Sequence, residues 1–380
     1  MAAASGSSRF RPWPDLPQEL LGLVLARVAS HADRVRLRAV CRPWRSGARQ
    51  QHPLPPLLPW LVLPDGTFLS LPDGAIHRVP VPHDVCYRVS TGGALFLVQG
   101  DGTCSLTSPS PTAATSLPKP AFCDGCTVVA YTRGSGRPGT TMKWAPPTGS
   151  SVADIALFKG KLYVLTTAEE LHVVDVHDEQ TTAVPAGKTL RVSSIPRDDE
   201  EHSMPWNDKR HKLDNPYAYD NYVERWYLVV SGDQLLMVKR MINIPSIGMR
   251  VWGIEKRTRR FRVFEAADLL NDGHGQWREV TMLTGRALFV SQGCSESIPA
   301  EADAQCGVTA GAQADCIYFV TEDLNVYFIP KWIHEKPLPN PFLDSGVYHM
   351  RDETVTSLPS EKSTMSVERP WSATWIFPET

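Results

Sequence analysis

Short apolar runs, each preceded by a turn, divide most of this chain. The longest uninterrupted runs are about five residues, as in Ala94–Val98 and Trp226–Val230. A helix that spans a bilayer needs about 20 apolar residues, whereas strands of globular proteins are usually about 3–10 residues long. The chain also carries 32 Pro and 26 Gly in 380 residues, and these residues favour turns. The sequence therefore predicts many short strands and no transmembrane helix.

The apolar runs form a loose repeat. Five segments join a turn or polar start to an apolar strand, at spacings of about 30 to about 70 residues: GGALFLV (92–98), GKLYVLT (160–166), DQLLMV (233–238), GRALFV (285–290) and DCIYFV (315–320). Propeller blades, which repeat every 40–45 or so residues, are the natural template. A pair of sheets packed as a β-sandwich is the competing one. Six or seven four-stranded blades fit the chain from Trp60 onward.

The first 50 residues follow a different pattern, with nine Arg, no Lys and three acidic residues. Apolar residues recur at helical spacing through Leu20, Leu21, Val24, Leu25 and Val28. Pro17 suits the first turn of this helix. We expect Asp33 to cap a second helix and Pro43 to open a third.

Composition sets the expected boundaries. Residues 1–8 are small and polar, and we expect them to be disordered. Residues 9–50 form the helical unit, the proline-rich residues 51–59 an extended linker, and residues 60–380 a mainly β domain. A polar insertion is expected near 193–222, and the small polar residues 294–313 are expected to form another loop. The fold class is thus α+β and multidomain.

A helical unit of about 35 residues buries too little surface to be stable alone. Its remaining apolar area needs a cover. Spacing alone leaves two candidates for that cover, a partner protein and the chain's own second domain.

The segment from Trp13 to Arg45 resembles an F-box. Leu16-Pro17 matches the Leu-Pro start of that family, Leu20-Leu21 its helical leucines, and Val40-Cys41-Arg42 with Trp44-Arg45 its ending. The resemblance implies docking on a Skp-type adaptor and, through it, on a cullin and a RING subunit of a ubiquitin ligase. The adaptor-binding residues that it implies are Leu16, Pro17, Leu20, Val40, Cys41 and Trp44.

The second domain resembles the C-terminal β-propeller of plant F-box proteins, whose function is poorly known. The matching motifs are Ala156–Val176, Arg225–Arg240, GRALFVSQ followed by an IYFV strand, and the closing Trp371–Glu379. This resemblance favours the propeller over the sandwich.

Charge and cysteine usage exclude several classes of protein. The formal net charge is −2, which argues against a binder of nucleic-acid phosphates. The N-terminus lacks the apolar core of a signal peptide, and the eight Cys are widely and irregularly spaced. They indicate reduced thiols in the nucleus or cytoplasm.

Motifs that carry chemistry are weak. Gly134–Gly139 matches GxGxxG but lacks a following helix to receive a pyrophosphate. Cys123 and Cys126 form a lone CxxC with no second ligand pair, and His172 and His177 would face opposite sides of a strand. The basic run Lys256–Arg260 is expected to be a charged hairpin turn, with a nuclear signal or an anion patch as the alternatives.

No cofactor, metal or catalytic set is therefore predicted, and the chain is expected not to be an enzyme. The expected function is a substrate-recognition subunit of a cullin-type ubiquitin ligase, with the propeller holding an unknown target protein. The alternatives are a non-degradative binding module and a propeller enzyme or small-ligand binder.

Overall fold

The structure of the 380-residue chain is a computed structural model. It describes residues 13–28, 30–50, 58–63, 66–71, 74–78, 85–91, 94–107, 115–117, 127–129, 141–143, 150–174, 188–190, 222–243, 257–269, 275–300, 311–322, 344–358 and 373–377.

The described N-terminal part is helical, as predicted. A short 3-10 helix (Trp13–Asp15) precedes α1 (Gln18–Arg27), α2 (His31–Val40) and α3 (Arg42–Gln50). Pro17 lies at the N-cap of α1, and Pro43 lies in the first turn of α3, where the missing N–H costs nothing. The expected cap of α2 is wrong. Ser30 is the N-cap, and its Oγ accepts a hydrogen bond from the backbone N–H of Asp33 at 3.4 Å.

The rest of the described chain is almost entirely β. Its strands form six sheets, and the strands of each sheet follow one another in this spatial order: β23 (Thr374–Ile376), β1 (Trp60–Val62), β2 (Thr67–Ser70) and β3 (Ile76–Arg78); β4 (Val85–Thr91), β5 (Ala94–Gln99), β6 (Cys104–Thr107) and β7 (Thr115–Leu117); β8 (Thr127–Val129) and β9 (Thr141–Lys143); β10 (Val152–Phe158), β11 (Lys161–Thr166), β12 (Leu171–Val174) and β13 (Lys188–Leu190); β14 (Tyr222–Ser231), β15 (Gln234–Asn243), β16 (Arg257–Ala267) and β17 (Gln276–Val280); β19 (Cys294–Pro299), β18 (Arg286–Ser291), β20 (Cys316–Phe319), β21 (Gly346–His349) and β22 (Thr354–Thr356).

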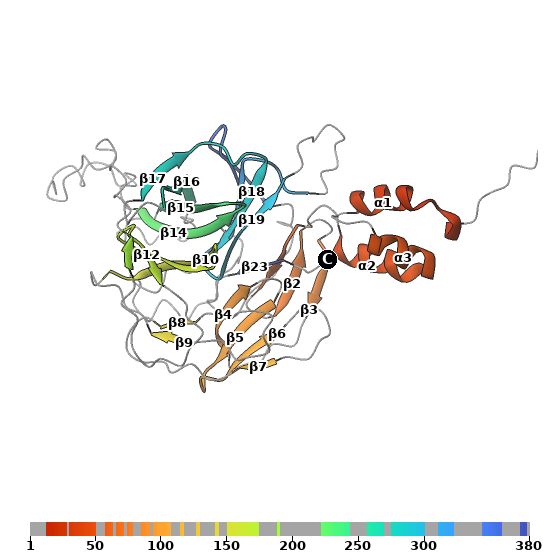
Figure 1. Cartoon of the computed structure of the whole chain (residues 1–380), viewed down its shortest axis with the longest axis horizontal. Coiled ribbons are helices and arrows are strands. Elements are labelled where there is room, and N and C mark those ends of the chain that lie inside the picture. The colour runs from red at the N-terminus through yellow and green to blue at the C-terminus, as the bar shows by residue number, and fades with distance from the viewer. Residues whose placement is uncertain are drawn as a thin grey trace, which may run out of the picture.

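One edge strand of each larger sheet faces the centre of the domain. β10 packs against β14, β14 against β19, β19 against β23 and β4, and β23 against β4. These five strands begin the orders of their sheets, so the sheets radiate outward from a common axis (Figure 1). This is the arrangement of a propeller, and the alternative of two facing sheets is wrong.

Side-chain alternation explains the continuous apolar runs of the sequence. On β18, Ala287 and Phe289 pack in a cluster shared with β1, β2 and β23, whereas Leu288 and Val290 pack in another shared with β14, β15 and β16. Successive side chains of a strand point to opposite faces. Both faces of these strands are buried between neighbouring sheets, so nearly every position is apolar.

The sheet that contains β18 departs from the simple inside-to-outside order. β18 turns back into β19, which takes the inner position, and β20 then pairs with β18 in parallel. The expectation of a loop over 294–313 is therefore wrong for Cys294–Pro299. This strand lies at the centre and is only partly buried over residues 294–296, so it carries no apolar run that would have marked it as a strand.

The end of the described chain closes the ring of sheets. β23 pairs with β1 in antiparallel register, with Trp60 opposite Ile376. The side chain of Trp375 is fully buried, and its Nε1 donates a hydrogen bond to the carbonyl oxygen of Val290 at 3.0 Å. Strands from the two ends of the β domain thus share one sheet.

Several sequence predictions fall on other residues. Residues 1–12, 51–57, 123–126, 134–139, 177 and 191–221 lie outside the described chain. Leu58, at the end of the expected linker, is buried in the cluster that Ala287 joins. The expected basic turn is wrong in part, because Arg257–Arg260 begin β16 rather than a hairpin turn.

The helices lie outside the ring of sheets, beside β3 and the marked C-terminus (Figure 1). His31 at the start of α2 meets Trp60 at the start of β1, with ring centroids 5.6 Å apart in an edge-to-face arrangement. Within the described part of the chain, no helix is long and apolar enough to cross a membrane.

Candidate functional site

The three helices share a small core. Leu21 and Leu25 of α1 pack against Trp44 and Ala48 of α3. Gly47 permits the close approach of α1 and α3, because a Cβ at this position would lie 3.0 Å from Cδ2 of Leu21. Only four apolar side chains are buried in this core. Most other apolar residues of the helical unit are therefore only partly buried or exposed.

Trp44 and Arg34 hold the unit together. Nε1 of Trp44 donates to the carbonyl oxygen of Trp13 at 3.0 Å, and the two rings meet edge to face at 6.4 Å. The buried Arg34 donates from Nε to the carbonyl oxygen of Val28 at 2.8 Å. The end of α1 is therefore tied to α2.

The six predicted adaptor-binding residues divide into two groups. Pro17, Leu20 and Val40 are exposed, and the exposed fractions of Leu20 and Val40 are 48% and 62%. Leu16 and Cys41 are partly buried against the helical core, and Trp44 belongs to it. The first group is available to a partner, whereas the second positions the helices.

Further exposed apolar residues extend the available surface. Leu23 and Val24 lie three and four residues after Leu20, so all three side chains lie on the same side of α1. Trp13 and Val35 are exposed as well. Leu23, Val35 and Trp13 were not in the predicted set. The apolar stripe of α1 gave a signal for Leu23, whereas the isolated Val35 and Trp13 gave none.

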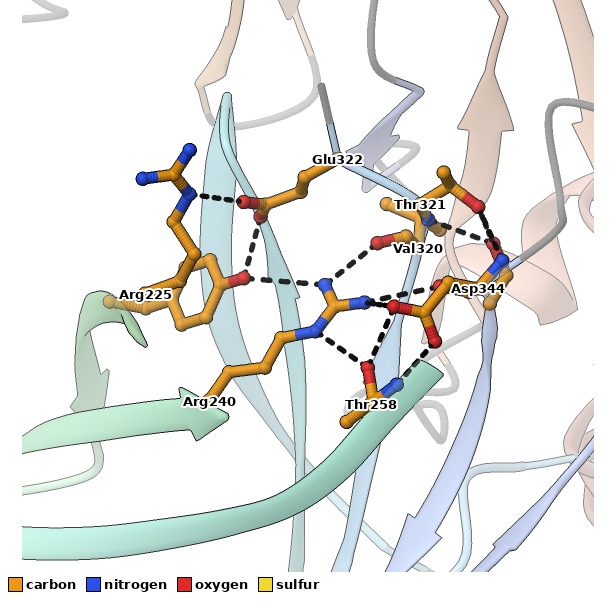
Figure 2. A network of polar contacts seen from close by, with 9 residues as sticks. Arg225, Arg240, Thr258, Val320, Thr321, Glu322 and Asp344 are labelled. Carbon is orange, nitrogen blue, oxygen red and sulfur yellow. Dashed lines mark hydrogen bonds and ion pairs between the residues drawn. The ribbon is translucent and has the colours of Figure 1, made fainter. Parts of the chain in front are cut away.

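A second group of polar residues lies buried between the sheet of β14 and the sheet of β20 (Figure 2). Its centre is Arg240, whose side chain is fully buried. The guanidinium donates to Oγ1 of Thr258 at 2.9 Å, to the carbonyl oxygen of Val320 at 2.8 Å and to Oδ2 of Asp344 at 3.0 Å. Asp344 also accepts from the backbone N–H of Thr258 at 2.8 Å. Arg240 therefore joins two neighbouring sheets.

Glu322 extends this network toward the inner strand β14. Its Oε1 accepts a hydrogen bond from the hydroxyl of Tyr227 at 2.6 Å, and its Oε2 lies 3.6 Å from Nε of Arg225. Burial and the charge of Glu322 raise the pKa of Tyr227 well above its usual value, so the phenol remains a donor. Burial opposes the charge of Arg240, but Tyr227, Asp344 and Glu322 together raise its pKa.

Asp154 on β10 lies close to this network. Its Oδ2 accepts from the backbone N–H of Leu228 at 2.8 Å, and its Oδ1 accepts from that of Ile155 at 2.8 Å. Burial raises the pKa of Asp154 to about 7, and the charge of Glu322 adds to this effect. Near neutral pH this carboxyl therefore carries only part of a charge.

Sequence reasoning missed the network. Its members come from β14, β15, the start of β16 and the segments that flank β20 and β21. The family motif Arg225–Arg240 contains three of them, but nothing in the motif identifies Glu322 or Asp344 as partners about 100 residues away. One signal was present in the pairing, since Arg225 lies directly opposite Arg240 and like charges at such positions require compensation.

The described side chains offer no metal site: no group of three or more His, Cys, Asp or Glu residues among them could hold an ion. The Cys316 thiol lies 3.3 Å from Nδ1 of His349. Burial and the charge of Asp315 raise the pKa of Cys316 to about 11. The thiol is therefore protonated near neutral pH, and a protonated thiol is a poor nucleophile.

These observations define a small F-box-like helical unit joined to a β-propeller. A family model described as F-box-like matches residues 13–52, and one described as the KIB1-4 beta-propeller matches residues 68–349. The chain belongs to the KIB1-4 β-propeller family, with an F-box-like domain in front of the propeller. The predicted family and fold class are thus confirmed.

Comparisons with individual proteins add little. No curated protein matches the chain. Among solved structures, an S. cerevisiae complex of Dbp5, Nup159, Gle1, IP6 and ADP and the N-terminal domain of Nup159 each match at 11% identity and a TM-score of 0.23, over 58% of this chain and 44% of theirs. Apo AztD from Citrobacter koseri matches at 11% identity and a TM-score of 0.25, over 85% of this chain and 98% of its own. This chain spans less than half of the first two, and likenesses at these scores place no constraint on fold or function.

Proposed function

We propose that the chain is a substrate receptor of a cullin-type ubiquitin ligase, acting in the nucleus or cytoplasm. The F-box-like helices bind a Skp-type adaptor, which connects the chain to a cullin and a RING subunit. The propeller binds the target protein. The order of the two domains and their family memberships support this assignment.

The distribution of exposed apolar side chains carries the proposal. Of the ten exposed large hydrophobic residues among those that the structure describes, six lie between Trp13 and Val40. Fully burying one such side chain contributes about 1.5–3 kcal/mol. A helical unit with so small a core and so much apolar surface is built to be covered by a partner.

The chain contributes proximity rather than bond chemistry. Holding a target beside a ubiquitin carrier makes the transfer effectively intramolecular. The receptor needs no nucleophile or cofactor for this role. The buried polar network, which joins two neighbouring sheets, is in keeping with a rigid binding domain.

Adaptor binding can be tested at the exposed positions. The full-length chain is co-expressed with a Skp-type adaptor and a cullin, and the amounts that co-purify are measured. We expect Leu20→Glu and Val40→Glu each to lower adaptor capture by about tenfold or more, because a buried unpaired carboxylate at the interface costs several kcal/mol. The matched control is Leu157→Glu, which places the same charge on an exposed leucine of β10.

The outcomes separate the proposed function from its alternatives. Capture of adaptor and cullin by the wild type and by Leu157→Glu, with loss in the two helix variants, supports the receptor. Capture of the adaptor without the cullin favours a non-degradative binding module. A soluble, folded wild type that captures neither contradicts the proposal, and a propeller that binds a small ligand or acts as an enzyme would then be the hypothesis to test.

A further inference from the structure

Arg225 projects one edge of its guanidinium out of the polar network. Nε faces Glu322, and Figure 2 shows the two terminal nitrogens pointing away from Glu322 and from the other labelled residues. Among the described residues, Glu322 is the one acceptor in contact with this side chain. The side chain as a whole is 23% exposed, so part of it is open to solvent.

The network fixes the position of this edge. Glu322 is 2% exposed and is itself held by the hydroxyl of Tyr227, which in turn lies 3.4 Å from Nη1 of Arg240. Arg240 is anchored to Val320, Thr258 and Asp344. A guanidinium that is held before binding loses less side-chain entropy when it binds.

The local charge balance permits a further anion. The charges of Arg225 and Arg240 balance those of Glu322 and Asp344, and the nearby Asp154 carries only part of a charge near neutral pH. The two terminal N–H groups of an arginine match two coplanar oxygens of a carboxylate or a phosphate. The exposed edge of Arg225 has the geometry for such a bidentate contact.

The direction of the inner strands places this edge on the side of the propeller away from the helices. β14 runs from Tyr222 through Arg225 to Ser231, and Ser231 contacts Ser297 in the second half of β19. Ser291, which is paired with the start of β19, contacts Thr374 at the start of β23. The inner strands β14, β19 and β23 therefore run in the same direction.

β23 ends at Ile376, which pairs with Trp60, and Trp60 meets His31 of the helical unit. The helical unit thus contacts the propeller at the start of β1, level with the end of the inner strand β23. Arg225 is the fourth of the ten residues of β14 and lies nearer the start of the strand than its end. Arg225 therefore lies away from the contact between His31 and Trp60.

We propose that Arg225 is an anchor for the target protein and receives an oxyanion of its side chains, either an Asp or Glu carboxylate or a phosphorylated Ser or Thr. The inference rests on the proposed function in taking the bound protein to be the ligase target. Tyr227, Glu322 and Arg240 are positioning residues that hold Arg225 in place.

Three peptide pools test this anchor with the full-length chain. The pools share degenerate flanks and differ at the central position, which is Glu, phosphoserine or Gln. The bound fraction of the chain is measured on each immobilised pool. We expect the wild type to prefer the Glu or the phosphoserine pool over the Gln pool by about tenfold, the size of one charge-assisted contact. A preference for Glu identifies the carboxylate as the source, and a preference for phosphoserine identifies the phosphate.

Variants isolate the contribution of Arg225. Arg225→Gln should abolish the preference, and Arg225→Lys, which keeps the charge but loses the planar fork, should keep only part of it. Arg278→Gln removes the charge of an exposed arginine on the outer strand β17 and should leave the preference intact. Urea unfolding of each variant shows whether Arg225→Gln is still folded, and if it is not, Arg225→Lys decides.

Adaptor capture is measured on the same samples. If the chain captures the adaptor but shows no preference for an anionic pool, the inference is overturned and the proposed function stays intact. The same holds if the adaptor is captured and both Arg225 variants retain the full preference. An anionic preference that depends on Arg225 in a chain that captures no adaptor overturns the proposed function instead, and the anchor is then no longer that of a ligase target.

Discussion

Arg240 is a single residue on which the contact between two sheets depends. Its side chain is fully buried and pairs with Asp344, which is only 10% exposed. Removing one partner of a buried ion pair leaves the other charge without compensation, at a cost of about 3–5 kcal/mol. The guanidinium also stacks over Phe319, with its carbon 4.7 Å from the ring centroid, so the same side chain supports the apolar packing.

We therefore expect Arg240→Met to lower the free energy of unfolding by about 3–5 kcal/mol. Arg262→Met is the matched control on the adjacent strand. Its partner Glu279 is 45% exposed, and ion pairs open to solvent contribute about 0–1 kcal/mol. Urea unfolding followed by tryptophan fluorescence measures both losses. Equal losses in the two variants would show that the buried network contributes no more than a surface pair.

Asp154 gives the stability of the protein a pH dependence of its own. Its pKa is raised by burial from 3.8 to about 7 in the folded protein. The folded state therefore holds a proton that the unfolded state has released, and stability falls as the pH rises from about 4 to about 7. The carboxyl of Glu322 is the charged group that adds to the raised pKa, and the backbone N–H groups of Leu228 and Ile155 oppose it.

Comparing wild type and Asp154→Asn at pH 5 and pH 7.5 tests this dependence. The variant should be less stable at pH 5, because its amide replaces an acceptor facing a backbone N–H, at about 1–3 kcal/mol. It should lose less stability than the wild type between the two pH values. Asp233→Asn, in the exposed turn between β14 and β15, should keep the wild-type pH dependence. An unchanged pH dependence in Asp154→Asn would contradict the raised pKa.

At the scale of elements, the sequence predicts strands whose two faces are both buried. The runs in β15, β18 and β20 are continuous because each strand is packed between neighbouring sheets, and the runs in β5 and β11 are buried along almost their whole length. β19 was not predicted, because residues 294–296 of this inner strand are only partly buried and need no apolar run. Arg257–Arg260 were assigned to a turn for a related reason, since charged side chains in β16 find partners that local sequence does not show, such as Glu353 for Arg260.

The two parts of the candidate site also differ in how far the sequence predicts them. The exposed apolar surface of the F-box-like helices depends on residues close in sequence, and α1 alone supplies Leu20, Leu23 and Val24. A helical period identifies such a face directly. The network around Arg240 joins residues up to 104 positions apart. Its pairing is set by the order of the sheets around the ring, which propensity and period do not encode.

At the scale of the whole molecule, the ring of sheets is closed by pairing β23 with β1. The first and last strands of the β domain share one sheet, and a missing β23 would leave the inner edge of β1 unpaired. Unpaired edges expose rows of backbone donors and acceptors that promote association. The fully buried Trp375 and Ile376 fill the space between this sheet and its neighbours.

A chain that stops after Ser372 should therefore lose the stability of the whole propeller rather than of one sheet. Truncating a fully buried tryptophan alone costs about 3–5 kcal/mol, and the lost strand adds its backbone hydrogen bonds. We expect this chain to aggregate, or to unfold at a clearly lower urea concentration than the wild type. The control stops after Phe377, keeps β23 and should unfold as the wild type does. If the shorter chain unfolds in the same transition as this control, closure by β23 is not what holds the ring together, and the clusters between the remaining sheets are sufficient.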